Sequence, residues 1–195
     1  MATLVAVATT LLLARHGETD WNRERRWQGH SDTPLNDAGR GQARALAAEL
    51  AGEPPDALYS SDLARSSETA EIVGGTLGLP VRLDRRLREV DVGEWSGLTR
   101  AEVEERYPEG VSRRLAGGTG WEHGESFAAM SERVVAALLD IAAGHDGGRV
   151  LVVTHGGPIV AAWLAAGGTF EERPAVANCQ VLRVRVGGRK IARLD

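Results

Sequence analysis

The chain has 195 residues, of which 43% are apolar and 26% are charged. A chain of this size and composition can bury a hydrophobic core, which argues against disorder and predicts a single domain over residues 1–195. The net charge of −4 excludes a global basic field that would hold nucleic acid or an anionic membrane. The single cysteine excludes an internal disulfide framework and a multi-cysteine zinc site.

Residues 1–14 are uncharged and mostly apolar, as the core of a signal peptide would be. They have no positively charged segment before the apolar run, and the run is too short to span a bilayer. We therefore expect a buried strand that closes at 11–14, in a cytoplasmic protein.

Short apolar runs then alternate with stretches of helical periodicity. The expected strands are 11–14, 57–60, 81–83 and 150–153, followed by a hairpin of 179–186 and 190–194 around two glycines. The expected helices are 37–50, one from 61 or 62 to 77, 99–107, 126–143 and one from 156–158 to 166. We expect residues 97–124 to form a cap or lid, in which the glycine-rich stretch 110–124 is irregular.

Capping residues set the expected helix starts. Asn36, Thr99 and Ser126 each precede a helical stretch, and Thr99 with Glu102 forms a capping-box pattern. Ser61 or Asp62 is the expected cap of the second helix. Pro158 suits the first position of the last helix.

The alternation of strands and helices predicts an α/β fold with a mostly parallel central sheet covered by helices on both faces. Ligands of such sheets bind beyond the carboxyl ends of the strands. Arg15 and His16 follow one expected strand, Arg65 lies just beyond a second, Glu89 follows the weak third and His155 follows a fourth. Two cations, two imidazoles, a carboxylate and two helix N-termini at one edge predict a site for a small dianion such as phosphate.

Six stretches together resemble the histidine phosphatase superfamily, also called phosphoglycerate mutase-like. They are LLLARHGETDWN (11–22), WQGHSDTPLNDAGR (27–40), SSDLARSSETA (60–70), LREVDVGEWSG (87–97), GES (124–126) and VVTHGG (152–157). They cover most of the chain in the family's order. The α/β fold that the resemblance implies agrees with the fold expected from the residues.

The resemblance implies a role for individual residues. His16 would be the nucleophile that becomes phosphorylated, and Glu89 would give a proton to the leaving oxygen. Three residues would bind the phosphoryl oxygens: Arg15, Arg65 and His155. Asn22, Gln28 and the backbone of Gly156 would be secondary contacts, Gln28 toward the substrate. No metal or cofactor is implied, since the arginines supply the positive charge.

Several alternatives stay open at this point. His16 and His155 are also consistent with packed core residues or a metal pair, and Glu89 with a solvated charge cluster. The segment VDVGEW after Glu89 resembles the phosphatase branch, and the mutases of the family differ there. The leading expectation is a metal-independent phosphomonoesterase of a small phosphorylated metabolite. A phosphoglycerate mutase and a non-catalytic phospho-ligand binding module are the alternatives.

Two further expectations concern contacts of the chain. Arg113 and Arg114 in the glycine-rich segment are either solvated charges or contacts to an anionic substrate tail. The C-terminal hairpin would lie at a sheet edge that a second copy can pair with, so a homodimer is one expectation. We expect neither nucleic acid nor a membrane as a partner.

Overall fold

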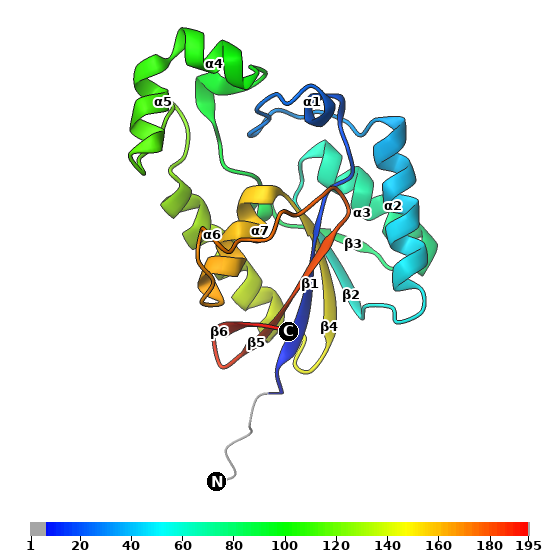
Figure 1. Cartoon of the computed structure of the whole chain (residues 1–195). Helices are drawn as coiled ribbons and strands as arrows, with labels where there is room; N and C mark the ends of the chain where they lie inside the picture. The colour runs from blue at the N-terminus through cyan, green and yellow to red at the C-terminus, as the bar shows by residue number, and fades with distance from the viewer. Residues whose placement is uncertain (1–6, 195) are drawn as a thin grey trace.

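The computed structural model describes residues 7–194 and contains a six-stranded sheet between two layers of helices (Figure 1). The strands are β1 (Thr9–Arg15), β2 (Ala57–Ser60), β3 (Val81–Leu83), β4 (Arg149–Thr154), β5 (Val181–Gly187) and β6 (Lys190–Arg193). The α-helices are α1 (Asp20–Arg23), α2 (Asp37–Leu50), α3 (Ala64–Leu77), α4 (Arg100–Arg106), α5 (Pro108–Leu115), α6 (Phe127–Ala143) and α7 (Gly156–Ala165). Two short 3₁₀ helices are η1 (Arg85–Leu87) and η2 (Gly93–Trp95).

The strands are arranged in the order β3-β2-β4-β1-β5-β6. The pairs β2–β3, β2–β4 and β1–β4 are parallel, whereas β5 and β6 add an antiparallel edge. The predicted mostly parallel α/β fold is thus confirmed. Because β1, β2 and β4 are neighbours that run in the same direction, their carboxyl ends meet at one edge of the sheet.

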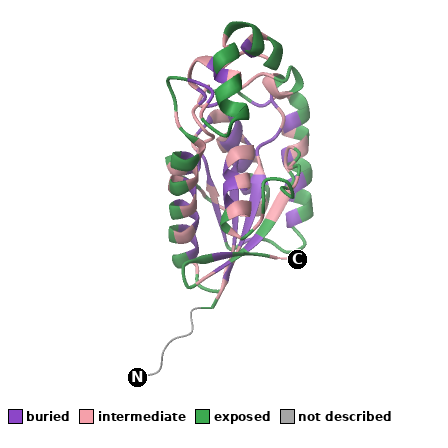
Figure 2. Ribbon diagram, turned by 60° about the vertical axis from the view of Figure 1, so that its left-hand side comes forward, coloured by how far each residue is buried: buried purple, intermediate pink, exposed green. Residues whose placement is uncertain are grey.

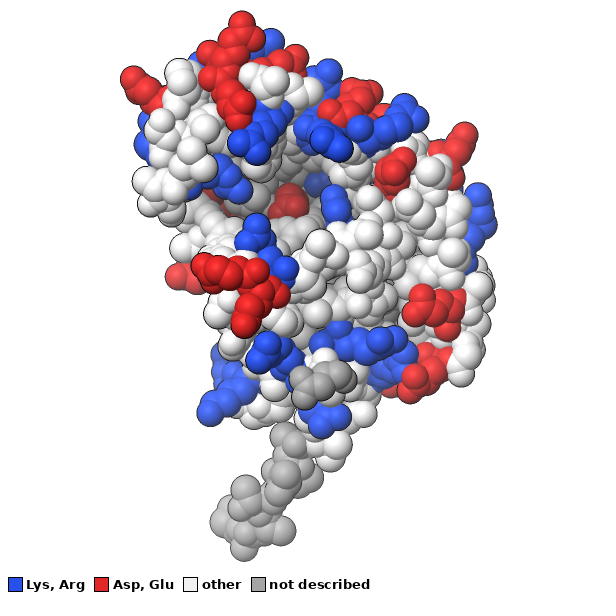
Figure 3. Space-filling view, viewed as in Figure 1, with Lys and Arg blue, Asp and Glu red and all other residues white. Residues whose placement is uncertain are grey.

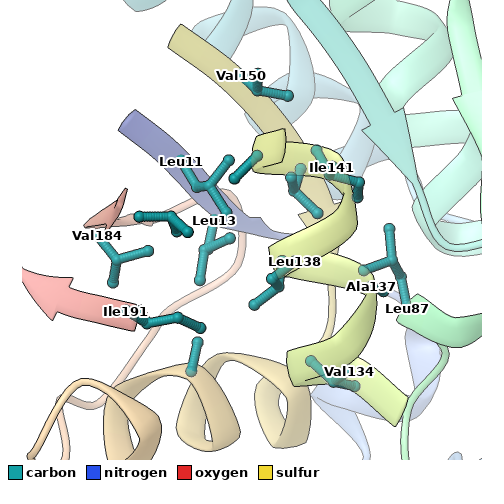
Figure 4. Packing of buried hydrophobic residues seen from close by; sticks show 14 of the residues in the cluster. Leu11, Leu13, Leu87, Val134, Ala137, Leu138, Ile141, Val150, Val184 and Ile191 are labelled. Atoms are coloured by element: carbon teal, nitrogen blue, oxygen red, sulfur yellow. The ribbon is translucent and has the colours of Figure 1, made fainter. Parts of the chain in front are cut away.

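Both faces of the sheet are covered, and successive residues of β1 serve opposite faces. Leu11 and Leu13 pack with α6 and α7 in the cluster drawn in Figure 4. Leu12 and Ala14 pack with α2 and α3. Buried residues accordingly follow the sheet in Figure 2. Burial on both faces explains why β1 and β4 are continuous apolar runs in the sequence.

Three predicted helix caps are confirmed. The side chains of Asn36, Thr99 and Ser126 each accept a hydrogen bond from the backbone three residues further on. Thr99 also forms the complete capping box with Glu102. These caps depend on local sequence alone, which is why a pattern could find them.

The predicted cap of α3 is wrong. The N-cap of α3 is Leu63, whose side chain cannot accept a hydrogen bond. The backbone N–H of Ala64 instead donates to Oδ1 of Asp32, 2.6 Å away. The carboxylate comes from a loop 32 residues earlier in the chain, so no local pattern indicates it.

Two other boundaries also differ from the expectation. Pro158 is the third residue of α7, because the helix begins directly after His155. The strand expected from residue 179 begins at Val181, because Cys179 has φ +58°, which is not a strand conformation. The start of the chain at 1–6, part of the expected first strand, lies outside the described residues.

The segment 97–124 is more regular than expected, since Pro108–Leu115 forms α5 rather than a loop. Val103 and Trp121 of this segment are buried in a separate apolar cluster together with Trp95, which lies just before the segment. A Cβ on Gly110 would lie 2.3 Å from the carbonyl oxygen of Gly120, so close packing explains a glycine inside this helix. In Figure 1, α4 and α5 project beyond the end of the sheet that is opposite the two termini.

Among residues 7–194, no helix is both long enough and apolar enough to span a membrane. The same residues contain no cluster of three or more His, Cys, Asp or Glu side chains placed to hold a metal ion.

Candidate active site

Three strand ends bring the two predicted imidazoles together. His16, Ser61 and His155 directly follow β1, β2 and β4. The His16 N–H donates to the Thr154 carbonyl at 2.9 Å, which extends the β1–β4 ladder by one bond. The ring centroids of His16 and His155 lie 5.2 Å apart, and the two residues are only 3% and 0% exposed. The parallel pairing of β1 and β4 therefore brings two imidazoles that are 139 positions apart in the sequence close together in the fold.

The hydrogen bonds of His16 fix its tautomer. Nδ1 lies 2.7 Å from the carbonyl oxygen of Gly17. A carbonyl oxygen only accepts hydrogen bonds, so Nδ1 carries the proton and the neutral ring has its lone pair on Nε2. That atom lies 3.3 Å from Nε of Arg65, which donates to it. The nitrogen that a nucleophile needs is thus free of its proton and held beside a guanidinium.

The surroundings of both imidazoles favour their neutral form. Burial lowers the pKa of His16 well below 6.5, and the charges of Arg65 and Arg15 lower it further. The pKa of His155 is also well below 6.5, because of burial and then the charge of Arg65. Both rings are therefore uncharged at neutral pH, which leaves the arginines as the positive charges of the site.

Arg65 is the second residue of α3 and is only 1% exposed. Its terminal nitrogens donate to the carbonyls of Ser31 at 2.8 Å and Gly29 at 2.9 Å, which leaves Nε directed at His16. Burial lowers the pKa of Arg65 to about 10. The guanidinium still carries its charge at pH 7, in a fixed orientation.

Four buried side-chain nitrogens have no hydrogen-bond partner within the described part of the chain, and two of them belong to this site, Nε of Arg15 and Nδ1 of His155. Arg15 donates from Nη1 to the Val176 carbonyl at 3.0 Å, and Nε2 of His155 lies 2.9 Å from the Ser61 hydroxyl. Each side chain is therefore anchored at one nitrogen and has another that can donate. Buried donors normally have an acceptor, and an anion bound at the strand ends can supply one.

Glu89 lies after η1, and its carboxylate reaches the first turn of α7. The backbone N–H of Gly157 is 3.2 Å from both carboxylate oxygens, and the N–H of Val90 is 2.9 Å from Oε1. A Cβ on Gly157 would lie only 2.2 Å from Oε1. Burial lowers the pKa of Arg15 and of Arg65, and the charge of Glu89 partly opposes this lowering at both guanidiniums, so the carboxylate lies close enough to interact with them.

The predicted secondary contacts lie around this centre. Oδ1 of Asn22 and Oε1 of Gln28 both accept hydrogen bonds from Thr19, at 3.1 to 3.2 Å. Both residues thereby hold the loop that follows His16. Gly156 is the first residue of α7, next to His155, and a Cβ there would lie 3.9 Å from Oε2 of Glu89.

Sequence reasoning missed three residues that support the site. The Ser61 hydroxyl contacts His155, and its place directly after β2 was the signal that could have found it. Asn178 donates to the His16 carbonyl at 2.9 Å, from an irregular segment that no pattern singles out. Arg133 of α6 donates to the carbonyl of Glu89 at 2.8 Å, from what reads as an ordinary polar position of a helix.

The surface is hollowed between the α4–α5 segment and the body of the molecule (Figure 3). Blue Lys and Arg atoms surround this hollow, and red acidic atoms lie inside it. Arg114 of α5 stacks on two indole rings, 5.1 Å from the centroid of Trp27 and 5.5 Å from that of Trp121. Arg114 and Trp121 of the segment 97–124 thus pack with Trp27, the residue directly before Gln28 in the chain.

Comparison with known proteins gives consistent results. The model of the histidine phosphatase superfamily (branch 1) matches residues 11–194. Phosphoglycerate mutase-like protein 4 of Arabidopsis thaliana is 43% identical over 154 residues, which are 76% of this chain and 67% of that protein. Probable phosphoglycerate mutase GpmB of Salmonella arizonae is 39% identical over 183 residues, covering 88% of this chain and 82% of that protein.

Solved structures are similar along nearly the whole chain. Bacillus stearothermophilus YhfR has a TM-score of 0.84 and 34% identity, covering 95% of both chains. A mycobacterial glucosyl-3-phosphoglycerate phosphatase solved with VO3 has a TM-score of 0.78 and 33% identity, covering 96% of both chains. The predicted resemblance is thereby confirmed, and the chain belongs to branch 1 of the histidine phosphatase superfamily.

Proposed function

We propose that the chain is a metal-independent phosphomonoesterase that hydrolyses a small phosphorylated metabolite through a phosphohistidine at His16. The observation that carries this proposal is the neutral His16 ring, whose Nε2 lone pair faces Arg65 beside the buried nitrogens of Arg15 and His155. A neutral imidazole can attack phosphorus, and fixed guanidiniums offset the charge that develops on the phosphoryl oxygens.

In the first step, Nε2 of His16 forms a bond to phosphorus while the bond from phosphorus to the ester oxygen breaks. The carboxyl group of Glu89 gives its proton to the leaving oxygen, and an alcohol departs. In the second step, water attacks the phosphohistidine and gives a proton to the Glu89 carboxylate. The phosphorus–nitrogen bond breaks, and inorganic phosphate and the free imidazole are restored.

Trapping the intermediate tests the nucleophile. We expect brief incubation with a ³²P-labelled monoester to give an acid-labile, base-stable label on the native chain and no label on His16→Ala. His123→Ala is the matched control, because its side chain is 90% exposed, and we expect it to be labelled like the native chain. Label on His16→Ala would exclude His16 as the nucleophile. A native chain that is never labelled and never turns over would instead favour the non-catalytic binding module.

A second candidate is phosphoglycerate mutase activity, since both relatives described above have phosphoglycerate mutase in their names. A mutase must keep water from the phosphoenzyme, and the open hollow of Figure 3 instead supports hydrolysis. The decisive assay supplies 3-phosphoglycerate and measures both products. Release of inorganic phosphate supports the phosphatase, whereas formation of 2-phosphoglycerate without phosphate release supports the mutase. A panel of phosphorylated metabolites, read by phosphate release, would then identify the substrate.

A further inference from the structure

We propose that Arg133, held by Glu125, is a positioning residue for Glu89, and that this pair controls how well the leaving group is protonated. The inference rests on the proposed role of Glu89 as the proton donor. Neither Arg133 nor Glu125 contacts His16, so their effect would act through the loop that carries Glu89.

All five N–H groups of the Arg133 guanidinium have acceptors. Nε and Nη2 donate to the two carboxylate oxygens of Glu125, at 2.7 and 2.6 Å. Nη1 donates to the carbonyls of Arg86 and Arg88, both at 2.8 Å, and Nη2 also donates to the carbonyl of Glu89 at 2.8 Å. One side chain thus binds three carbonyls within four residues and ends at the residue that carries the acid.

The loop around Glu89 depends on such contacts, because residues 88–92 belong to neither a helix nor a strand. Other contacts to its backbone come from Thr154, whose hydroxyl donates to the Leu87 carbonyl at 2.7 Å, and from His30, whose Nε2 lies 2.8 Å from the Glu89 carbonyl. Arg133 is the contact that joins 86, 88 and 89 to one rigid helix. Small displacements of a reacting group lower rates strongly, so this anchor matters for proton transfer.

Hydrogen bonds to its own backbone N–H and carbonyl hold Glu125 in place. Its N–H donates to the Asp91 carbonyl at 2.9 Å, and its carbonyl accepts from the indole N–H of Trp121 at 2.9 Å. The side chains of Arg133 and Glu125 are 22% and 19% exposed. A bidentate, half-buried pair with fixed ends holds its geometry better than an exposed ion pair.

The test uses the dependence on the leaving group, which a purely structural role would not change. An aryl phosphate such as p-nitrophenyl phosphate expels a phenolate, which can leave without being protonated. An alkyl phosphate such as glycerol 2-phosphate expels an alkoxide, which needs a proton to leave as the alcohol. We measure kcat/KM for both, because it reports the steps up to loss of the alcohol. For Arg133→Lys, we expect a loss of about tenfold or more for the alkyl ester and under about threefold for the aryl ester.

Two reference variants complete the design. Glu89→Gln should show the same selectivity with larger losses. Arg86→Lys is the matched control, because the Arg86 guanidinium binds Asp84 and Asp140 instead of the loop carbonyls, and we expect nearly native values for both esters. Inhibition by inorganic phosphate should be unchanged in Arg133→Lys. If Arg133→Lys does not fold by circular dichroism, Glu125→Gln replaces it, with the same selective loss expected.

The outcomes separate this inference from the proposed function. Selective loss in Glu89→Gln together with equal losses for both esters in the folded Arg133 or Glu125 variant overturns the inference alone. Equal losses for both esters in Glu89→Gln overturn the acid role and the inference with it, whereas the label on His16 would be unaffected. Selective loss in both variants supports the positioning role.

Discussion

At the scale of single residues, the site depends on backbone atoms as much as on side chains. A carbonyl one residue away selects the tautomer of His16, and the Gly157 N–H meets both oxygens of Glu89. Backbone groups of this kind are fixed in place by the fold, so they orient a side chain without an entropic cost of their own at the moment of reaction. Two glycines, 17 and 157, thus contribute through their backbone atoms, a carbonyl and an N–H.

Gly157→Ala should impair proton transfer to the leaving group. The new Cβ would lie 2.2 Å from Oε1 of Glu89, so the carboxylate must move away from the N-terminus of α7. We expect kcat/KM for an alkyl phosphate to fall by about tenfold or more, and that for p-nitrophenyl phosphate to change much less. Inhibition by inorganic phosphate serves as the control, since Arg15, Arg65 and His155 keep their positions. An unchanged rate with the alkyl ester would contradict the proposed contact.

The residues of the site were predictable to different degrees. His16, Arg65 and His155 could be found because each directly follows or lies close to an apolar strand, and strand ends of a parallel sheet meet. The partners of these residues could not be found in that way. Asn178 reaches His16 from an irregular segment, and Asp32 caps α3 across the fold, so only the folded chain brings them to their contacts.

At the scale of elements, α2 supports the loop after His16 through two glycines that touch. A Cβ on Gly39 would lie 2.1 Å from the carbonyl oxygen of Glu18, and one on Gly17 would lie 2.6 Å from the carbonyl oxygen of Gly39. By contrast, a Cβ on Gly41 of the same helix would have no described atom within 4 Å. Helix α2 is therefore packed backbone against backbone at Gly39 and is open at Gly41.

This contrast predicts opposite effects of the same substitution in one helix. Gly41→Ala should raise the free energy of unfolding by roughly 0.5–1 kcal/mol, since alanine is the better helix former, and should leave activity unchanged. Gly39→Ala should lower the free energy of unfolding by about 1–3 kcal/mol, because the clash outweighs the propensity, and should reduce kcat/KM by shifting the loop. Urea unfolding and an aryl phosphate assay measure both quantities. Stabilisation by Gly39→Ala would contradict this prediction, because it would mean that the loop after His16 moves away from the new Cβ at little cost.

Elements were predictable where their signals are local. The caps at Asn36, Thr99 and Ser126 and the alternation in β5 depend on neighbours in sequence. Helix α5 was missed because glycines at 110, 117, 118 and 120 indicate a loop. In the structure, Gly110 instead allows α5 to pack against Gly120 and Trp95, which is a tertiary contact and leaves no periodic signal.

At the scale of the whole molecule, the fold class followed from the order of strands and helices, but the order of strands in the sheet did not. The central position of β4 and β1 joins residues 10–15 to 149–154, contacts that no local signal specifies. Burial of the site is likewise a property of the complete fold. Arg65 is 1% exposed only because the loop of 29–31, α3 and the strand ends close around it.

Burial of two neutral imidazoles makes the stability of the whole molecule depend on pH. The pKa of His16 and that of His155 are well below 6.5 in the folded chain, whereas in the unfolded chain both are near ~6.5. Below that pH the unfolded chain binds protons that the folded chain excludes, so the free energy of unfolding must fall. The slope reaches roughly 1.4 kcal/mol per pH unit for each histidine. Carboxylates such as Asp62, with a pKa that is low even when unfolded, contribute only at more acidic pH.

We therefore expect urea unfolding to give a smaller free energy at pH 5 than at pH 7, with most of the loss between pH 6.5 and 5. His155→Asn should remove about half of that slope, whatever its effect on stability at pH 7, because asparagine does not titrate. His123→Ala is the control and should keep the native slope, since it removes an exposed side chain and leaves both buried imidazoles in place. An equal slope in the native chain and in His155→Asn would mean that the buried ring of His155 accepts a proton in the folded state, and the neutral form assigned to His155 would then be wrong.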